Sequence, residues 1–257
     1  MQINRSANDN HLIFKKVRDE NSYLILFIAS LLFIEFVISL FVIPIKATES
    51  RIPFNSIYAI NNTKALCAIV SQVIAYILFI CMTCAICNKV LVVEFNDFKA
   101  KLAKNLLMIL AFGVGIYVVD IVVGTIYAII GENGTSMNQL MIYGALVSPI
   151  KWPTIILTIL LAPIVEEVIY RKFMISTLHL RLRLPIWVAG VISASIFALI
   201  HVASSIDQLV YFPQYFAMAM VLVAAYIYSG QNIYFSIGIH IFNNAVSIII
   251  WAISTLI

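Results

Sequence analysis

The chain has 257 residues, 63% of them hydrophobic and only 11% charged, and its formal net charge is +4. A soluble domain is about half apolar and about one quarter charged, so this composition excludes an ordinary soluble protein and predicts a chain embedded in a lipid bilayer. The Lys and Arg residues lie between the apolar runs rather than in one patch, which argues against nucleic acid as a partner.

The apolar runs are unbroken and have the length of membrane-crossing helices, which need about 20 residues. They lack the alternation of polar and apolar residues that a membrane β-barrel requires. The sequence therefore predicts an all-α, polytopic transmembrane helix bundle with seven spans, at approximately 23–43, 66–87, 106–130, 153–177, 185–204, 209–229 and 233–257. The stretch 137–150 is short and contains Pro149, so we expect a half-helix or interfacial segment there; counted as a span, it would make eight.

The distribution of basic residues predicts an orientation, because cytoplasmic loops are enriched in Lys and Arg. Residues 1–22 lack the apolar core of a signal peptide, so we expect a cytoplasmic tail followed by one transmembrane domain, 23–257. With the N-terminus inside, the inner segments hold 12 of the 16 Lys and Arg residues and the outer segments hold 4. The last inner group is Arg171, Lys172, Arg181 and Arg183. We expect the C-terminus outside.

Three cysteines share one apolar run, at Cys81, Cys84 and Cys87. Their spacing resembles part of an iron–sulfur ligand set, but the fourth ligand and the proline that follows it are missing. We interpret these cysteines as small residues of a membrane helix.

Ionisable residues inside membrane spans are costly and are therefore candidates for function. The fourth predicted span contains Glu166 and Glu167, whose side chains should point about 100° apart and so should not face the same partner. Glu167 and Arg171 are spaced as a favourable i,i+4 ion pair. We expect Glu166, left without that partner, to point into the bundle as a base or ligand.

Two further spans carry polar residues. His201 follows the apolar run of the fifth span, and His240 and Asn244 share one face of the seventh at i and i+4. At about 1.5 Å per residue, Glu166 and His240 lie about 10 Å from the inner face, whereas His201 lies about 24 Å from it. We therefore expect the fifth span to start later, tilt strongly or break, with 184–189 interfacial.

These residues form the patterns Glu-Glu-x-x-x-Arg, Phe-x-x-x-His and His-x-x-x-Asn, each in a separate apolar helix. In this order they resemble the CPBP family of intramembrane peptidases, a family of CAAX prenyl endopeptidases and of bacteriocin-processing and Abi-type proteins. The match uses Glu166, Glu167, Arg171, Phe197, His201, His240 and Asn244, and it places the catalytic core within 153–257. Tyr170 and Lys172 stand where phenylalanine and glycine are common in the family.

The resemblance implies hydrolysis of a peptide bond by a water that Glu166 and His201 activate. His240 and Asn244 would stabilise the oxyanion, while Glu167, Arg171 and Phe197 would support the catalytic residues. A second version of the mechanism uses Glu166, His201 and His240 as the ligands of a zinc ion. The sequence leaves both versions open, so it implies no certain cofactor and keeps zinc as an alternative.

The implied substrate is a membrane-associated peptide or protein: a CAAX protein, a bacteriocin or leader peptide, or a signalling peptide. A bacterial plasma membrane is the expected location. Two non-enzymatic alternatives are a proton-coupled transporter, which often shows internal repeats that are not seen here, and a membrane scaffold. Glu35 and Asp120 also lie within predicted spans, where we expect hydrogen bonds to neighbouring helices more readily than contact with a substrate.

Overall fold

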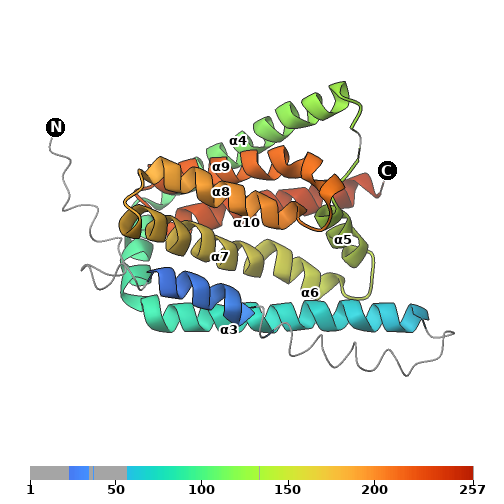
Figure 1. Ribbon diagram of the computed structural model, residues 1–257, viewed down its shortest axis with the longest axis horizontal. Helices are drawn as coiled ribbons and strands as arrows, with labels where there is room; N and C mark the ends of the chain where they lie inside the picture. The colour runs from blue at the N-terminus through green and yellow to red at the C-terminus, as the bar shows by residue number, and fades with distance from the viewer. Residues whose placement is uncertain (1–22, 35–36, 38–56, 133, 257) are drawn as a thin grey trace.

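The computed structural model describes residues 23–34, 37, 57–132 and 134–256. The regular structure of these residues is entirely helical, which confirms the predicted all-α polytopic bundle (Figure 1). Two apolar helices, Tyr23–Ile34 and Ile186–Val202, are shorter than a typical span. Five others are long and apolar enough to cross a membrane: Leu66–Ala100, Leu102–Ile129, Lys151–Arg181, Ile206–Tyr228 and Ile233–Ser254. Together these helices account for the seven predicted elements.

The second helix is longer than the span predicted at 66–87. Helix α3 covers Ile57–Ala100, 44 residues, and continues past Cys87 through Lys89 and Glu94. The apolar run ends at the charged residues, but lysine and glutamate are good helix formers, so the helix does not end there. Helix α4 (Leu102–Ile129) agrees closely with its prediction.

The short segment after α4 is confirmed as a short helix. Helix α5 (Met137–Leu146) has 10 residues, about half the length that a span needs. Its N-cap is Ser136, whose side chain accepts a hydrogen bond from the Gln139 N–H. Tyr215 on α9 (Phe212–Tyr228) lies 2.6 Å from the Ser136 hydroxyl and so ties α5 to the bundle.

The fourth predicted span is one long helix, Lys151–Arg181, whose backbone alternates between α and π geometry. Its segments are α6 (Lys151–Ile156), η3 (Leu157–Leu161), α7 (Ala162–Glu166), η4 (Glu167–Ile175) and η5 (Thr177–Arg181), of which the three η segments are π-helical. Every residue of η4 is buried, including Arg171 and Lys172. These two cations are therefore covered by protein rather than exposed on the surface of the bundle.

Lys172 instead belongs to a buried polar cluster. Its ammonium contacts the Glu94 carboxylate of α3 and the carbonyl oxygen of Gln231, the latter at 3.4 Å. Glu94 also accepts a 2.9 Å hydrogen bond from the N–H of Ile233, the first residue of α10 (Ile233–Ser254). The cluster therefore joins α3 and η4 to the turn that precedes α10.

Helix α8 (Ile186–Val202) is unbroken, so the expectation of a later start or a break is wrong. The predicted depths of Glu166 and His201 disagreed because the preceding helix was predicted to end at residue 177, whereas it ends at Arg181. Glu166 lies 15 residues before Arg181, and His201 lies 15 residues after Ile186. Both side chains are thus about 20 Å from the turn that joins the two helices. The turn before α10 lies beside Lys172, and so closer to Glu166 along the long helix than the turn before α8. This position brings His240 to the same level as Glu166 and His201.

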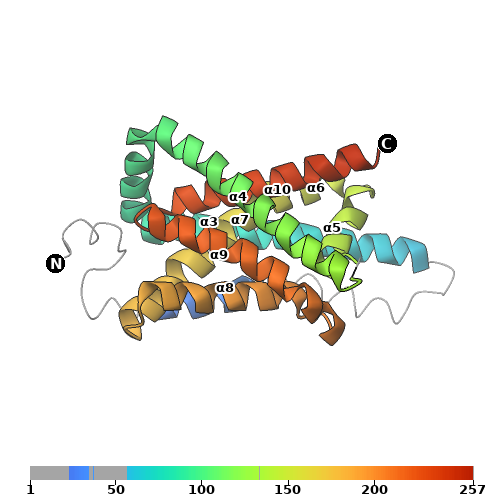
Figure 2. The ribbon, with the colours of Figure 1, turned by 90° about the horizontal axis from the view of Figure 1, so that it is seen from above.

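Small residues let the helices approach closely. A Cβ on Gly190 of α8 would lie 2.4 Å from Val223 Cγ1 of α9, and a Cβ on Gly238 of α10 would lie 2.6 Å from Ile109 Cδ1 of α4. Such close approach is how helices associate in lipid, where apolar burial against water contributes little. Figure 2 shows α4 crossing α9 and α10 obliquely.

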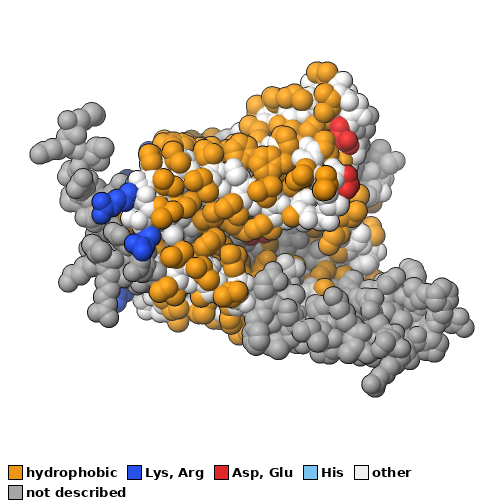
Figure 3. Space-filling model, viewed as in Figure 1, with side chains coloured by type: hydrophobic (Ala, Val, Ile, Leu, Met, Phe, Trp, Pro, Cys, Tyr) orange, Lys and Arg blue, Asp and Glu red, His pale blue; other side chains and the backbone are white. Residues whose placement is uncertain are grey.

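The outside of the bundle is apolar. Many large hydrophobic side chains of α3, α4 and α8 are exposed, among them Leu107 at 65% and Ile121 at 68%. In the view of Figure 3 hydrophobic side chains cover the middle of the molecule, with Lys and Arg at one end and Asp and Glu at the other. This surface fits a bilayer, and the chain is an integral membrane protein.

Candidate active site

The two glutamates occupy different surroundings although they are adjacent in sequence. Glu166 ends α7 and Glu167 begins η4. The side chain of Glu167 is completely buried, whereas that of Glu166 remains 19% exposed and lines a cavity.

Glu167 is the centre of a polar network. Its Oε2 lies 3.2 Å from Nε of Arg171, which confirms the predicted i,i+4 pair. The Ser236 hydroxyl of α10 donates to the same oxygen, and Nδ1 of His240 lies 3.0 Å from Oε1. The Arg171 guanidinium also packs 5.1 Å over the Phe197 ring of α8. Glu167 and Arg171 therefore connect three helices of the site.

His240 contacts both glutamates. Its Nδ1 donates to Glu167, and its Nε2 lies 3.8 Å from Oε2 of Glu166. The expectation that the glutamates cannot face the same partner is wrong for two reasons. An imidazole ring has a nitrogen on each of two edges. The backbone also changes from α to π geometry between the glutamates, and its wider turn separates successive side chains by less than 100°.

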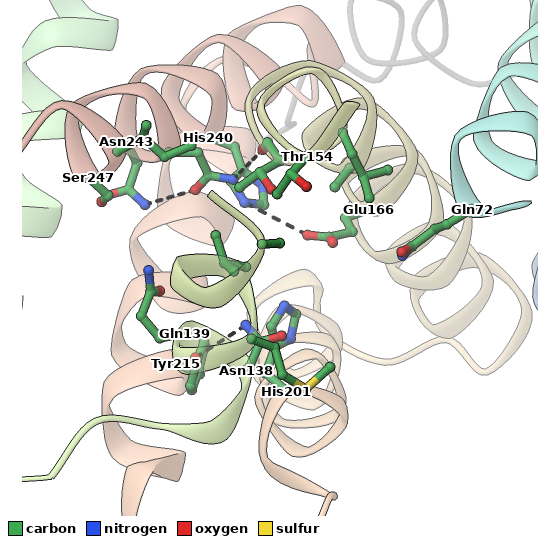
Figure 4. Close-up of a pocket in the computed structure, with 18 of the residues that line it drawn as sticks. Gln72, Asn138, Gln139, Thr154, Glu166, His201, Tyr215, His240, Asn243 and Ser247 are labelled. Carbon is green, nitrogen blue, oxygen red and sulfur yellow. Dashed lines mark hydrogen bonds and ion pairs between the residues drawn. The ribbon is translucent and has the colours of Figure 1, made fainter. Parts of the chain in front are cut away.

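His201 is oriented by its own helix and by aromatic neighbours. Its Nδ1 donates to the carbonyl oxygen of Phe197 at 2.8 Å, because a carbonyl can only accept. The ring stacks on Tyr215, with the centroids 5.0 Å apart. Figure 4 shows His201 beside Tyr215 and Asn138, away from the contact between Glu166 and His240. Both histidines thus use Nδ1 for support, which leaves Nε2 for other partners.

Asn244 is held against the π-helical segment η3. Its amide donates to the carbonyl oxygen of Thr158 at 2.9 Å. The carbonyl of Asn244 accepts from Nδ2 of Asn243 at 3.2 Å. Insertions of π geometry free backbone carbonyls from the helix ladder and are frequent at functional sites. One amide hydrogen of Asn244 is therefore engaged, and one is left for another acceptor.

These groups meet at one cavity of about 290 Å³, formed by α3, α5, α8, α9, α10 and the long helix (Figure 4). All four predicted catalytic residues line it: Glu166, His201, His240 and Asn244. The supporting residues Glu167, Arg171 and Phe197 lie behind its wall. The polar lining also includes residues that the sequence analysis missed: Gln72, Asn138, Gln139, Tyr215, Asn243 and Ser247.

Ser236 could have been found from the sequence, because it lies four residues before His240 on the same helix face as Asn244. Nothing in the sequence indicated Tyr215, because its contact with His201 depends on how α9 packs against α8. Of the other polar residues considered, Glu35 lies outside the described residues, and Asp120 lines a separate cavity. The cysteines of α3 are unbridged, with Cys81 and Cys84 exposed and Cys87 buried.

The proposed zinc ligands do not form a metal-binding set in this arrangement. Among the described residues, no three His, Cys, Asp or Glu side chains are grouped closely enough to hold one metal ion. Glu166 and His240 approach each other, whereas His201 is directed to the opposite part of the cavity beside Tyr215 (Figure 4).

Comparison with known proteins finds a family model that is similar to part of the chain. Residues 148–246 match the family model of Rce1-like type II CAAX prenyl endopeptidases. The match contains all seven motif residues and confirms the resemblance seen in the sequence. No curated protein and no solved structure matches the chain.

Proposed function

We propose that the chain is an intramembrane endopeptidase that cleaves a membrane-associated peptide or protein with a water activated by Glu166. The Rce1-like match implies a membrane protease in general terms. The observation that carries the finer assignment is the contrast between the glutamates. Glu167 is saturated by Arg171, Ser236 and His240, whereas Glu166 is partly exposed in a cavity that both histidines line.

In this mechanism the water lies in the cavity that Glu166, His201 and His240 line. The 3.8 Å separation of Glu166 Oε2 and His240 Nε2 is too long for a direct hydrogen bond and suits one bridged by water. Glu166 takes a proton from the water, whose oxygen attacks the scissile carbonyl carbon, and His201 orients the water through Nε2. Glu166 then passes the proton to the departing amine, so that a carboxylic acid and an amine are released.

The oxyanion of the tetrahedral intermediate requires donors that are already in place. We assign this task to Nε2–H of protonated His240 and to the remaining amide hydrogen of Asn244. Both side chains are anchored from behind, His240 by Glu167 and Asn244 by the Thr158 carbonyl. Because Glu166, His201 and His240 are not grouped as metal ligands here, we propose a glutamate-type rather than a zinc-dependent reaction.

We propose two substrate classes, a prenylated CAAX-type protein and a bacteriocin or leader peptide, and a cytoplasmic N-terminus in a bacterial plasma membrane. The test uses purified protein in detergent with two fluorogenic peptides that differ only in a farnesyl group. Wild-type protein should cleave at least one of them, and Glu166→Gln should cleave neither. Equal cleavage by both proteins would refute the assignment of Glu166. Cleavage of the unmodified peptide alone would refute the prenylated substrate.

A further inference from the structure

A second cavity adjoins the candidate active site. It has a volume of about 310 Å³ and lies between α4, α5, α9 and α10. Five residues line both cavities: Gln139, Tyr215, Met218, Asn243 and Ser247. A peptide that reaches Glu166 would therefore pass within reach of the second cavity.

Asp120 of α4 supplies the charge of this second cavity. No other acidic or basic side chain in the described part of the chain lines it. Asp120 makes no hydrogen bond or ion pair with any described residue. The nearby acid Glu132 differs, because its Oε1 accepts from Tyr211 Oη and from the Gly134 N–H, each at 2.9 Å.

The cavity wall is polar and is hydrogen-bonded to α10, the helix that carries His240. One turn before Asp120, the Tyr117 hydroxyl donates to the Asn243 carbonyl of α10 at 2.9 Å. Asn243 lies three residues after His240. Ser136, Gln139 and Gln214 add neutral polar groups to the lining. The cavity thus offers hydrogen-bonding groups and one negative charge.

A carboxylate within a membrane-crossing helix is costly unless a cation or a hydrogen-bond donor compensates it. The described residues provide neither to Asp120. A positively charged group of a ligand could pair with the Asp120 carboxylate, and the described residues that line the cavity provide no other charge. A neutral apolar group would leave the carboxylate uncompensated and lose its own contacts with lipid.

We propose that this cavity is a specificity subsite that binds a lysine or arginine side chain of the substrate through Asp120. The inference rests on the proposed endopeptidase function and adds a preference for a cationic residue near the scissile bond. Asp120 acts in binding and takes no part in the chemistry.

The experiment measures binding separately from cleavage. Fluorescently labelled peptides of leucine and alanine each carry one lysine, and its position differs from peptide to peptide. Each peptide is compared with a counterpart that carries norleucine at that position. Binding is measured by fluorescence anisotropy with full-length Glu166→Gln protein, which should not cleave the peptides. At one position the lysine peptide should bind at least about tenfold tighter than its norleucine counterpart, as expected for a charge pair removed from water. An N-acetylated series distinguishes the lysine side chain from a terminal amine.

Adding Asp120→Asn should reduce this ratio to about one, Asp120→Glu should retain it, and the matched control Glu132→Gln should leave it unchanged. Because the readout is a ratio within each variant, a general loss of folded protein does not imitate the effect. An unchanged ratio in Asp120→Asn, or no preference for lysine at any position, overturns the subsite. A lysine preference in binding without cleavage by wild-type protein supports the subsite and refutes the proposed function.

Discussion

Glu166 and Glu167 share a helix turn but differ in what their loss should remove. Glu167 is fully buried, forms an ion pair with Arg171 and accepts hydrogen bonds from Ser236 and His240, so its charge is part of the structure. Glu166 has a partly exposed carboxylate at the cavity, where a proton acceptor can reach a water and a substrate. One adjacent pair thus contains a structural acid and a candidate base.

Replacing Glu166 by Gln should leave the protein folded and lower the cleavage rate at least about a hundredfold, the usual contribution of a general base. The amide has the shape of the carboxylate but cannot accept the proton. The measurement is peptide cleavage together with the melting temperature in detergent. Cleavage at the wild-type rate would remove Glu166 from the mechanism.

Replacing Glu167 by Gln should instead lower the stability of the protein, because it leaves buried Arg171 less well compensated. Unpairing a buried ion pair costs about 3 to 5 kcal/mol. Arg171→Gln should show a similar fall in melting temperature, since it breaks the same pair. If Glu167→Gln keeps the wild-type melting temperature and Glu166→Gln unfolds, the two roles are reversed.

Activity should survive moderate chelation, because the groups around Glu166 act as a base and as hydrogen-bond donors in the proposed mechanism. The test measures cleavage and bound metal in the same purified preparation before and after dialysis against a chelator. Stoichiometric zinc, with activity lost on its removal and regained on its return, would establish the metal-dependent version.

The sequence was informative about residues whose partners are close along the chain. The Glu167–Arg171 pair and the shared face of His240 and Asn244 follow from helical spacing alone. The contact of His240 with both glutamates does not, because it depends on how α10 packs against a helix 73 residues earlier. For the same reason, Glu94 and Lys172 gave no indication of being partners.

At the scale of elements, the long helix Lys151–Arg181 shows where prediction from periodicity ends. An apolar run indicates a helix but does not distinguish α from π geometry. It therefore gave no indication of the three π segments. They nevertheless shape the site, since η3 presents the Thr158 carbonyl to Asn244 and η4 begins between the glutamates. Helix ends were predicted poorly where charged residues continue a helix, as in α3.

The close packing of α8 against α9 should be sensitive to one methyl group. A Cβ at Gly190 would lie 2.4 Å from Val223 Cγ1, and valine is too short and stiff to move away. Gly190→Ala should therefore destabilise the protein by about 1 to 3 kcal/mol, the usual cost of overpacking. Thermal unfolding in detergent measures the change.

The control for Gly190 is Gly124→Ala on α4, where an added Cβ meets nothing within 4 Å. This change should be neutral or slightly stabilising, because alanine favours a helix over glycine. Shortening the neighbour in Gly190→Ala/Val223→Ala should recover part of the loss. Equal melting temperatures for Gly190→Ala and wild type would mean that the two helices are not in close contact.

For the whole molecule, the orientation in the membrane stays a prediction from the distribution of basic residues. Arg171 and Lys172 are buried within the bundle, and without them the predicted inner segments hold 10 basic residues against 4 in the outer segments. We still expect the N-terminus inside and the C-terminus outside. Cysteine labelling at Ser6 and Thr255 with a membrane-impermeant reagent tests this, and labelling of both from the same side would contradict an odd number of spans.

The central claim is that this bundle places Glu166 in the membrane as the base of a peptidase. The most direct test compares the peptide N-termini in membranes of cells that express wild-type protein or Glu166→Gln at equal levels, using chemical labelling and mass spectrometry. We predict a set of new N-termini, within or next to apolar segments, that appears with wild-type protein and is absent with Glu166→Gln. Identical sets of N-termini from the two kinds of membrane, with both proteins folded, would contradict the claim.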